Sequence, residues 1–291
     1  MTLEVLPFAG LLAGKLASRP ETGLSLYWLG QAGFLLDSGR HRLLIDPYLS
    51  DSLAQKYRDR GPSHERMMPV PIEIDEMPPL DFILCTHHHT DHLDAATLGP
   101  LARRFAQLRL VVPRASLKLA QDRTGLDPER FIGMDAGETL ILDDAIEVQA
   151  VRAAHEDLQR DGQGHHLFLG YGLGVNGIRV FHSGDTIPYA GQVEEVRALA
   201  ADLALLPVNG RSPALAAAGI AGNFTLDEAV ELASSCGISA VLAHHYGLFA
   251  FNTLAPETID ARVAAMTGPT RLLRAGTGIE YRLAGPSEMT V

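Results

Sequence analysis

A short run of metal-binding residue types constrains this chain more than any other feature. It follows the apolar stretch Phe82-Ile83-Leu84, which is typical of a short buried strand. After a strand, His87 and His89 can face the same cation, and the turn that follows directs Asp91 and His92 towards a second. The alternative is a His-rich surface loop, but a solvated loop does not require the spacing H-x-H-x-D-H. The run therefore predicts a site for two metal ions.

Three further strands are predicted to end in metal-ligand residues. The strand 146–151 runs into His155, which we expect to be the third ligand of the first cation, because such sites use three or four protein ligands. The strand 178–182 leads to Asp185, whose two oxygens suit it to bridge both ions. The last of the three, 239–243, ends in His244 and His245. Because side chains alternate along a strand, only one of these two can complete the second site.

Other residues near these strand ends leave alternatives open. Asp46 follows the strand 42–45 and either orients a ligand histidine or forms an Asp-Pro turn with Pro47. His182 is out of phase with Asp185, so we expect it to be packed or hydrogen-bonded. The long loop 48–79 could fold over the site as a lid. His64 and Arg66 in this loop either contact substrate or form a solvated pair.

The rest of the chain alternates between strand and helix patterns. Residues 24–30, 33–37 and 42–46 predict a β-meander, and Asn176-Gly177 predicts a hairpin turn between strands 167–172 and 178–182. Helices are predicted at 1–20 in part, 95–107, 116–122, 192–200, 225–234 and 257–266, with a closing strand at 271–273. Because the predicted ligands come from both halves of the chain, we expect residues 1–291 to form a single domain.

Composition excludes several classes of protein. The net charge of −11 argues against a nucleic-acid partner, since such proteins usually carry a basic patch. Two cysteines cannot form a disulfide framework and fit a reducing compartment. The first twenty residues have the wrong charge order for a secretory signal, and no run of eighteen apolar residues occurs. We therefore expect a cytoplasmic protein without a membrane partner.

Eight short motifs together resemble the metallo-β-lactamase superfamily and, within it, the L-ascorbate-6-phosphate lactonase family. They are Trp28-Leu29-Gly30-Gln31-Ala32-Gly33-Phe34, Asp46-Pro47-Tyr48-Leu49-Ser50, Thr86-His87-x-His89-x-Asp91-His92, Ala154-His155-Glu156, His182-Ser183-Gly184-Asp185-Thr186, Asn209-Gly210-Arg211, Gly222-Asn223 and His245-Tyr246-Gly247.

The resemblance implies an α+β fold, a four-layer αβ/βα sandwich with a dinuclear metal site at the sheet edge. By this resemblance His87, His89 and His155 would hold one ion and Asp91, His92 and His245 the other, with Asp185 between them. It favours His245 over His244, because the family's histidine directly precedes an aromatic residue and Gly. It also favours manganese over zinc, although imidazole and carboxylate ligands suit both metals.

The expected activity is hydrolysis of a sugar lactone resembling L-ascorbate 6-phosphate. Two ions would acidify a shared water to hydroxide, which attacks the lactone carbonyl. Asp91 and Asp185 are the expected catalytic residues, with Asp91 carrying a proton to the leaving oxygen. The candidates for binding the polar end of the substrate are Arg211, Asn209, Asn223 and His64. Between Arg211 and Gly222 the family tends to carry charged residues, whereas 212–218 has none, so Arg211 is the obvious phosphate clamp.

Two other functions fit the same predicted site. One is a metal-dependent phosphodiesterase, and the other is a non-catalytic metal-bound interaction or sensor protein. For its partners we expect a small-molecule substrate and further copies of the same chain in a homo-oligomer.

Overall fold

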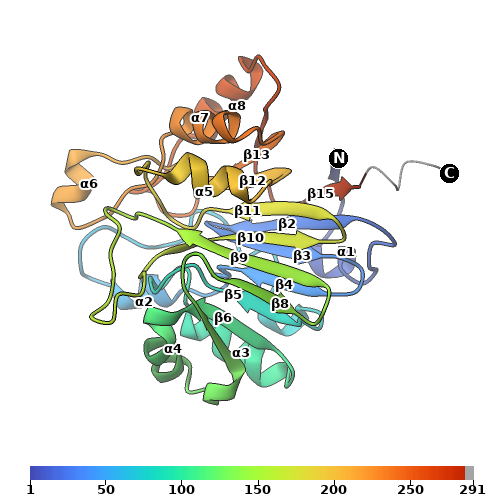
Figure 1. Cartoon of the computed structure of the whole chain (residues 1–291). Helices are drawn as coiled ribbons and strands as arrows, with labels where there is room; N and C mark the ends of the chain where they lie inside the picture. The colour runs from blue at the N-terminus through green and yellow to red at the C-terminus, as the bar shows by residue number, and fades with distance from the viewer. Residues whose placement is uncertain (286–291) are drawn as a thin grey trace.

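Two β-sheets face each other at the centre of the molecule, with helices on their outer sides (Figure 1). The computed structural model describes residues 1–285. One sheet has eight strands in the order β1-β15-β2-β3-β4-β5-β6-β7, and the other has seven in the order β14-β13-β12-β11-β10-β9-β8. Helices α3 and α4 pack on the first sheet and α5, α7 and α8 on the second. The predicted αβ/βα sandwich is confirmed.

The strands of the two sheets have the following bounds. In the first sheet they are β1 Thr2–Pro7, β2 Leu24–Gly30, β3 Gly33–Asp37, β4 Arg42–Ile45, β5 Phe82–Leu84, β6 Arg109–Pro113, β7 Phe131–Met134 and β15 Ile279–Ala284. In the second they are β8 Thr139–Leu142, β9 Ile146–Arg152, β10 Leu169–Val175, β11 Ile178–His182, β12 Leu203–Pro207, β13 Ala240–His244 and β14 Arg271–Arg274.

The helices are mostly short. They are α1 Leu12–Lys15, α2 Ser52–Lys56, α3 Ala95–Arg104, α4 Leu117–Thr124, α5 Gln192–Ala198, α6 Pro213–Ala217, α7 Leu226–Cys236 and α8 Pro256–Ala264, with 3-10 turns at Ile74–Glu76, Arg114–Ser116 and Pro128–Arg130. Helix α7 begins with a capping box formed by Thr225 and Glu228. Within the described part of the chain, no helix is both long and apolar enough to cross a bilayer.

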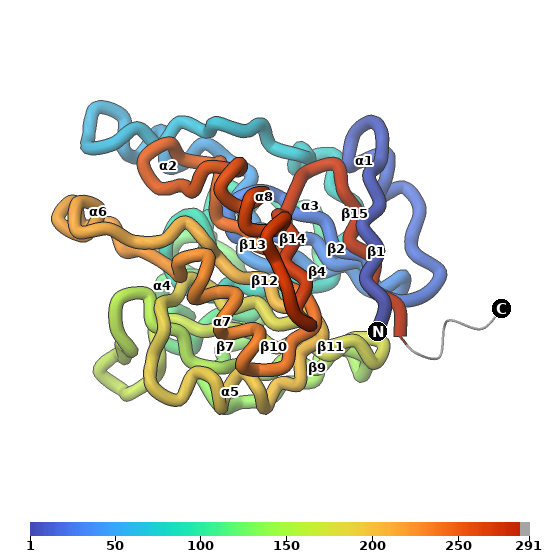
Figure 2. Tube along the Cα trace, turned by 90° about the horizontal axis from the view of Figure 1, so that it is seen from above, coloured from blue at the N-terminus to red at the C-terminus, as the bar shows by residue number. Residues whose placement is uncertain are grey.

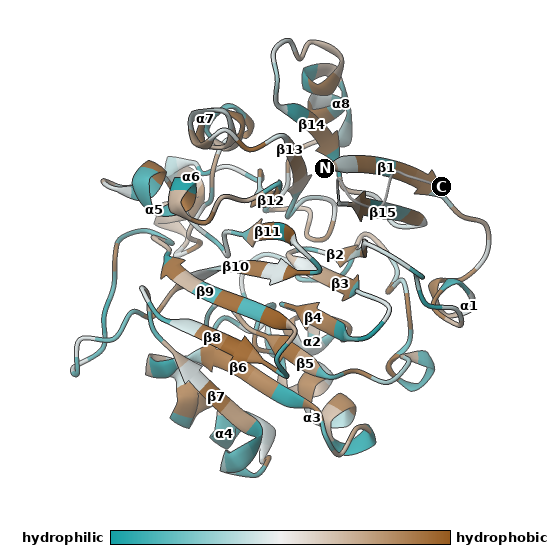
Figure 3. Ribbon diagram, turned by 45° about the vertical axis from the view of Figure 1, so that its right-hand side comes forward, coloured by the Kyte–Doolittle hydropathy of each residue, from teal (hydrophilic) through white to brown (hydrophobic). Residues whose placement is uncertain are grey.

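Alternation along the strands of the first sheet fills two separate cores. In β2, Leu24, Leu26 and Trp28 face the core shared by the two sheets, whereas Tyr27 and Leu29 face the core beneath the helices. Strands β3, β4 and β5 alternate in the same way. Figure 3 shows the result, with hydrophobic residues along the strands and hydrophilic ones on the outer surfaces of α4 and α5. Because both faces of the sheet are buried, its strands read as continuous apolar runs.

The two ends of the chain were predicted incorrectly. Residues 2–7 form strand β1 rather than part of a helix, and only the four residues of α1 are helical before Pro20. Strand β1 pairs antiparallel with β15, so that Thr2 lies opposite Ala284 and the first and last strands are neighbours (Figure 2). The strand at 271–274 is therefore not the closing one. Strand β7 was also missed.

Strands β4 and β5 are parallel neighbours, as are β11, β12 and β13, so the carboxyl ends of each set meet at one edge of its sheet. The predicted metal-ligand residues follow the carboxyl ends of β5, β11 and β13, and His155 follows β9, which runs in the same direction as β11 because both are antiparallel to β10.

Candidate metal centre

Seven side chains from four segments of the chain converge at this edge. They are His87, His89, Asp91 and His92 after β5, His155 after β9, Asp185 after β11 and His245 after β13. Their ligand atoms form three overlapping groups, in each of which all atoms lie within 4.8 Å of one another. The groups are His87–His89–His155, His87–His92–Asp185 and Asp91–His92–His245. The structure thus brings all seven predicted ligand residues together.

The first group consists of neutral imidazoles. Burial lowers the pKa of His87 well below its usual range, and it lowers the pKa of His155 to about 4. The pKa of His89 is lowered too, again chiefly by burial. A neutral imidazole keeps a lone pair on one ring nitrogen, which is the form that binds a metal ion.

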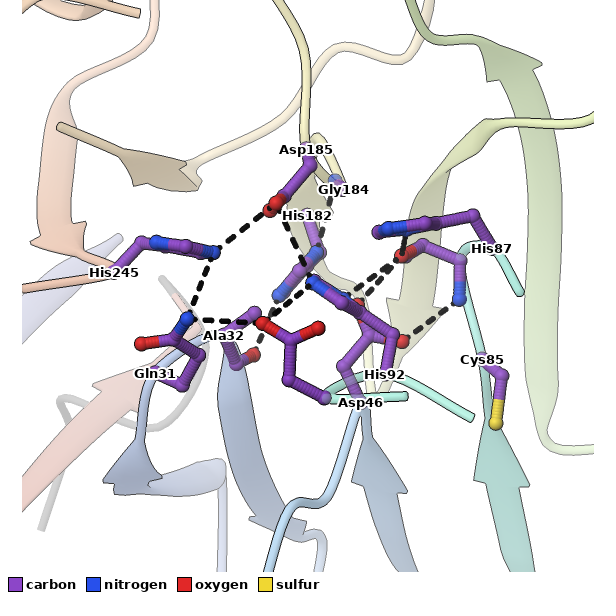
Figure 4. Close-up of polar contacts among 12 residues, drawn as sticks. Gln31, Ala32, Asp46, Cys85, His87, His92, His182, Gly184, Asp185 and His245 are labelled. Atoms are coloured by element: carbon purple, nitrogen blue, oxygen red, sulfur yellow. Dashed lines mark hydrogen bonds and ion pairs between the residues drawn. The ribbon is translucent and has the colours of Figure 1, made fainter. Parts of the chain in front are cut away.

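Asp185 belongs to the second group and points towards His245 of the third (Figure 4). Its Oδ2 is 3.0 Å from His245 Nε2, 3.4 Å from His92 Nε2 and 3.8 Å from His155 Nε2. Burial alone would raise the pKa of this carboxyl group, but His245 and His92 outweigh burial and hold it well below its usual range. Asp185 is therefore an ionised carboxylate.

Gly184 allows the chain to deliver Asp185 at this point. Its φ is +62°, and a Cβ atom there would lie 2.6 Å from the Leu169 carbonyl oxygen and 3.0 Å from Thr86 Cβ. Only glycine combines this backbone conformation with such close neighbours.

Asp46 holds the His-rich turn from behind. Its Oδ2 lies 2.7 Å from His92 Nδ1 and accepts a hydrogen bond of 2.6 Å from the Thr86 hydroxyl, and its Oδ1 accepts one of 2.7 Å from the Thr86 amide. The Thr86 oxygen is in turn 3.0 Å from His87 Nδ1. Both Nδ1 atoms therefore face oxygen, so His92 and His87 present Nε2 to the centre. Of the two interpretations of Asp46, the geometry supports the orienting role.

Gln31, between β2 and β3, fixes the other side of the centre. Its amide nitrogen donates to Asp91 Oδ2 at 2.9 Å and lies 3.2 Å from His245 Nε2. Burial alone would raise the pKa of Asp91, but His92 and other neighbouring groups outweigh burial, so the pKa lies below its usual value. Sequence reasoning assigned no role to Gln31.

The cluster fits divalent ions. His87 Nε2, His92 Nε2 and Asp185 Oδ1 are buried without a hydrogen-bond partner. Leaving such groups unpaired costs about 1–3 kcal/mol each, and a shared cation removes that cost. Imidazole and carboxylate donors suit zinc, manganese and iron.

The centre forms the floor of a pocket of about 370 Å³. One wall is aromatic and comes from two segments, with Tyr57 and His64 from the loop 48–79 and Phe249 and Phe251 from the loop after β13. The remaining lining residues outside the metal cluster are Gln31, Leu53, Lys56, His88, Thr90, Arg123, Gly219, Ile220, Ala221 and Asn252. Residues of the segment 48–79 thus line the pocket.

Of the four predicted substrate contacts, only His64 lines the pocket. His64 lines the pocket, with its ring 4.3 Å from that of Tyr57. Arg211 does not line it: its guanidinium pairs with both oxygens of Glu228, each at 2.6 Å, which occupies the group expected to clamp a phosphate. This is a correction to the sequence-based assignment.

Asn209 and Asn223 also lie outside the lining, but they form a chain of amides that reaches it. Asn223 Nδ2 donates to Asn209 Oδ1 at 3.0 Å, and Asn209 Nδ2 donates to Asn252 Oδ1 at 2.8 Å. Asn252, which lines the pocket, is thereby left with its amide N–H groups available. Asn209 and Asn223 thus position Asn252, and Asn252 is the residue of the three that lines the pocket.

Two further histidines near the cluster, His182 and His244, are not part of it. His182 Nε2 donates to the Ala32 carbonyl at 2.9 Å and its Nδ1 accepts from the Gly184 amide at 3.0 Å, as expected for a hydrogen-bonded residue. His244 is fully buried against Phe34 and His182, so only His245 joins the cluster.

Comparison with known proteins agrees with the fold and the centre. A sequence profile described as the beta-lactamase superfamily domain matches residues 41–246, which include all seven ligand-type residues. This chain belongs to the beta-lactamase superfamily, which confirms the broader of the two resemblances.

Among curated relatives, a "UPF0173 metal-dependent hydrolase" of Caldivirga maquilingensis is 28% identical over 226 residues, covering 77% of this chain and 82% of that one. Another from Aeropyrum pernix is 27% identical over 274 residues, covering 88% and 97%. An "N-acyl-phosphatidylethanolamine-hydrolyzing phospholipase D 1" of Caenorhabditis elegans is 25% identical, covering 80% of this chain and 66% of that one.

Solved structures share the fold at low identity. The metallo hydrolase Igni18 of Ignicoccus hospitalis superimposes with a TM-score of 0.62 at 19% identity, covering 90% of this chain and 100% of that one. An isothiocyanate hydrolase from Delia radicum gut bacteria gives a TM-score of 0.71 at 13% identity, covering 89% and 99%.

Proposed function

We propose that this chain is a metal-dependent hydrolase whose centre holds two divalent ions, manganese or zinc. The observation that carries the proposal is the convergence of seven ligand-type side chains whose ring nitrogens and carboxylate oxygens are partly unpaired. His87, His89 and His155 would hold one ion, Asp91, His92 and His245 the other, and Asp185 would contact both. The metal-dependent hydrolases among the relatives support the same class.

Bound divalent ions acidify water and polarise a carbonyl or phosphoryl oxygen. The protein's own groups supply position and proton transfer. Asp91 is ionised, and its Oδ2 is held at 2.9 Å by the Gln31 amide, so it can take a proton from the attacking water and pass it to the leaving oxygen. Asp185 brings its negative charge to the centre of the cluster, where it balances charge on the ligand histidines.

We propose a lactone as the substrate, as the resemblance to the lactonase family implies. In this reaction a bond forms between the water oxygen and the lactone carbonyl carbon, and the ring C–O bond breaks. The ring oxygen leaves with a proton, so the product is a hydroxy acid. A pocket of about 370 Å³ supports a small cyclic substrate. Because Arg211 is paired with Glu228, it gives no support for a phosphate group on the substrate.

A screen of the metal-loaded protein tests this proposal. Sugar lactones with and without a phosphate should be opened, and chelation with EDTA should abolish turnover. Absence of hydrolysis of lactones, esters and phosphodiesters, with both ions bound, would contradict it and favour the interaction or sensor function.

A phosphodiesterase is the second candidate, and one observation favours it. The Caenorhabditis elegans relative is named for cleaving a phosphodiester in a lipid, and it covers 80% of this chain at 25% identity. Hydrolysis of bis-p-nitrophenyl phosphate faster than any lactone by the same preparation would favour this alternative.

A further inference from the structure

We infer that Arg123 recognises an anionic group, a carboxylate or a phosphate, on the molecule that the pocket binds. The inference rests on the proposed function, because it assigns the substrate class of the same pocket. It gives the pocket the anion-binding role that the sequence had assigned to Arg211.

Arg123 lies in the last turn of α4 and lines the pocket beside His88. One guanidinium nitrogen donates to the His88 carbonyl, which fixes the head group next to the His-rich turn. A guanidinium carries five N–H donors in a planar fork. Most of them are therefore left for a ligand, at a head group whose position is already set.

The charge of Arg123 is not balanced by the protein. In residues 1–285 no ion pair joins it to a carboxylate, and burial is the cause that lowers its pKa. Arg211 and Arg114 differ, since each pairs with a glutamate. A half-buried cation without a counter-charge is costly, whereas a carboxylate or phosphate offers it two parallel hydrogen bonds.

A second cation, Lys56 at the end of α2, lines the same pocket and is likewise without an ion pair among the described residues. The whole chain carries a net charge of −11, so two unpaired cations here run against the overall balance. The carboxylates in the lining, Asp91 and Asp185, belong to the metal cluster. Such a local positive field attracts anions to the pocket.

Binding of three probes to the zinc-loaded protein tests the inference without requiring turnover. Benzoate, phenyl phosphate and the neutral benzamide are titrated by ligand-detected NMR. Arg123→Gln should weaken binding of at least one anion by about tenfold, the amount expected for a lost charge-assisted hydrogen bond, and leave benzamide unchanged. The anion that loses more identifies the group that Arg123 prefers.

Three further measurements complete the test. Lys118→Gln removes a charge from the same helix at a side chain that is 81% exposed, and should change none of the three affinities. Arg123→Met, which keeps the aliphatic stem, replaces Arg123→Gln if the latter fails to fold. Zinc content is measured for each variant to show that the centre is intact.

Two results would overturn the inference. One is that both anions bind to the Arg123 variants as tightly as to the wild type, or fail to bind the wild type at all. The other is equal weakening of benzamide and the anions, which would show that Arg123 only supports the turn. Either result leaves the proposed hydrolase activity open, because no step of the test depends on turnover.

Discussion

Asp46 supports two ligand histidines without belonging to the metal cluster. A substitution at Asp46 therefore tests how much the orientation of these histidines contributes to metal binding, with all seven ligand-type residues retained. Asp46→Asn keeps the size of the side chain and tolerates the φ of +44° at this position, but it loses the charge that faces His92 Nδ1 and Thr86. We expect zinc affinity to fall by about 10–100-fold, the usual effect of removing such a partner.

Competition with a chelator measures that affinity. Asp51→Asn is the control, because Asp51 is exposed and its side chain makes no capping hydrogen bond to α2. Equal zinc affinity in Asp46→Asn and the wild type would contradict the orienting role.

The buried histidines make the metal-free protein sensitive to acid. Burial lowers the pKa of His155 and of His88 to about 4, whereas an unfolded chain binds these protons at about 6.5. Between these values the unfolded state binds more protons, so stability falls as the pH drops from about 6.5 to about 4. His92 acts in the opposite direction. Burial alone would lower its pKa, but Asp185 and Asp46 outweigh burial and hold the pKa well above its usual value. The stability that His92 contributes is therefore lost as the pH rises.

Urea unfolding of the EDTA-treated protein across this window checks the prediction. The curve of stability against pH should be shallower for His155→Asn than for the wild type. Ile141→Ala, which changes no titratable group and alters a side chain that is 54% exposed, should leave the slope unchanged. Identical slopes for His155→Asn and the wild type would show that this histidine does not cause the acid sensitivity.

At the scale of elements, the aromatic side of the pocket comes from the segment after α2 and the loop after β13. Phe249 is 2% exposed, packs with Tyr48, Leu53 and Leu248, and lies 5.3 Å from the His64 ring. Phe249→Ala should lower the free energy of unfolding by about 3 kcal/mol and raise KM, while zinc content is retained.

Kinetics and metal analysis of the same preparation give both readouts. The matched control is Ile141→Ala, which removes an apolar side chain that is 54% exposed on β8. Loss of zinc with an unchanged KM would mean that Phe249 supports the centre rather than the wall.

The elements that carry ligands were predictable because their signals are local. A short apolar or alternating strand followed by His or Asp identifies β5, β9, β11 and β13, and Asn176-Gly177 adopts the positive φ values of a tight hairpin turn. The pocket wall was not predictable in this way. Phe249 and Arg123 are 126 positions apart in the chain, and only the folded structure brings both to the lining of one pocket. Arg211 was misassigned for the same reason, since nothing in its neighbourhood indicates that Glu228 occupies it.

At the scale of the whole molecule, the metal centre joins the two sheets. Four of the ligand-type residues follow β5 of the first sheet, and the other three follow β9, β11 and β13 of the second. The first and last strands, β1 and β15, pair at one edge of the first sheet, and no local pattern indicates so distant a pair. This architecture supports our proposal that residues 1–291 act as one domain.

A single domain predicts a single cooperative unfolding transition. Zinc should raise its midpoint, because an ion held by both sheets binds the folded state only. Calorimetry and circular dichroism with zinc and with EDTA measure this. Two separate transitions, of which zinc shifts only one, would contradict the single domain.

Anomalous diffraction from crystals of the zinc-loaded protein tests the central claim most directly. The account predicts two adjacent ions at the edge of the sheets, held by His87, His89 and His155 on one side and by Asp91, His92 and His245 on the other, with Asp185 contacting both. A single ion, or ions bound away from these seven side chains, would contradict it.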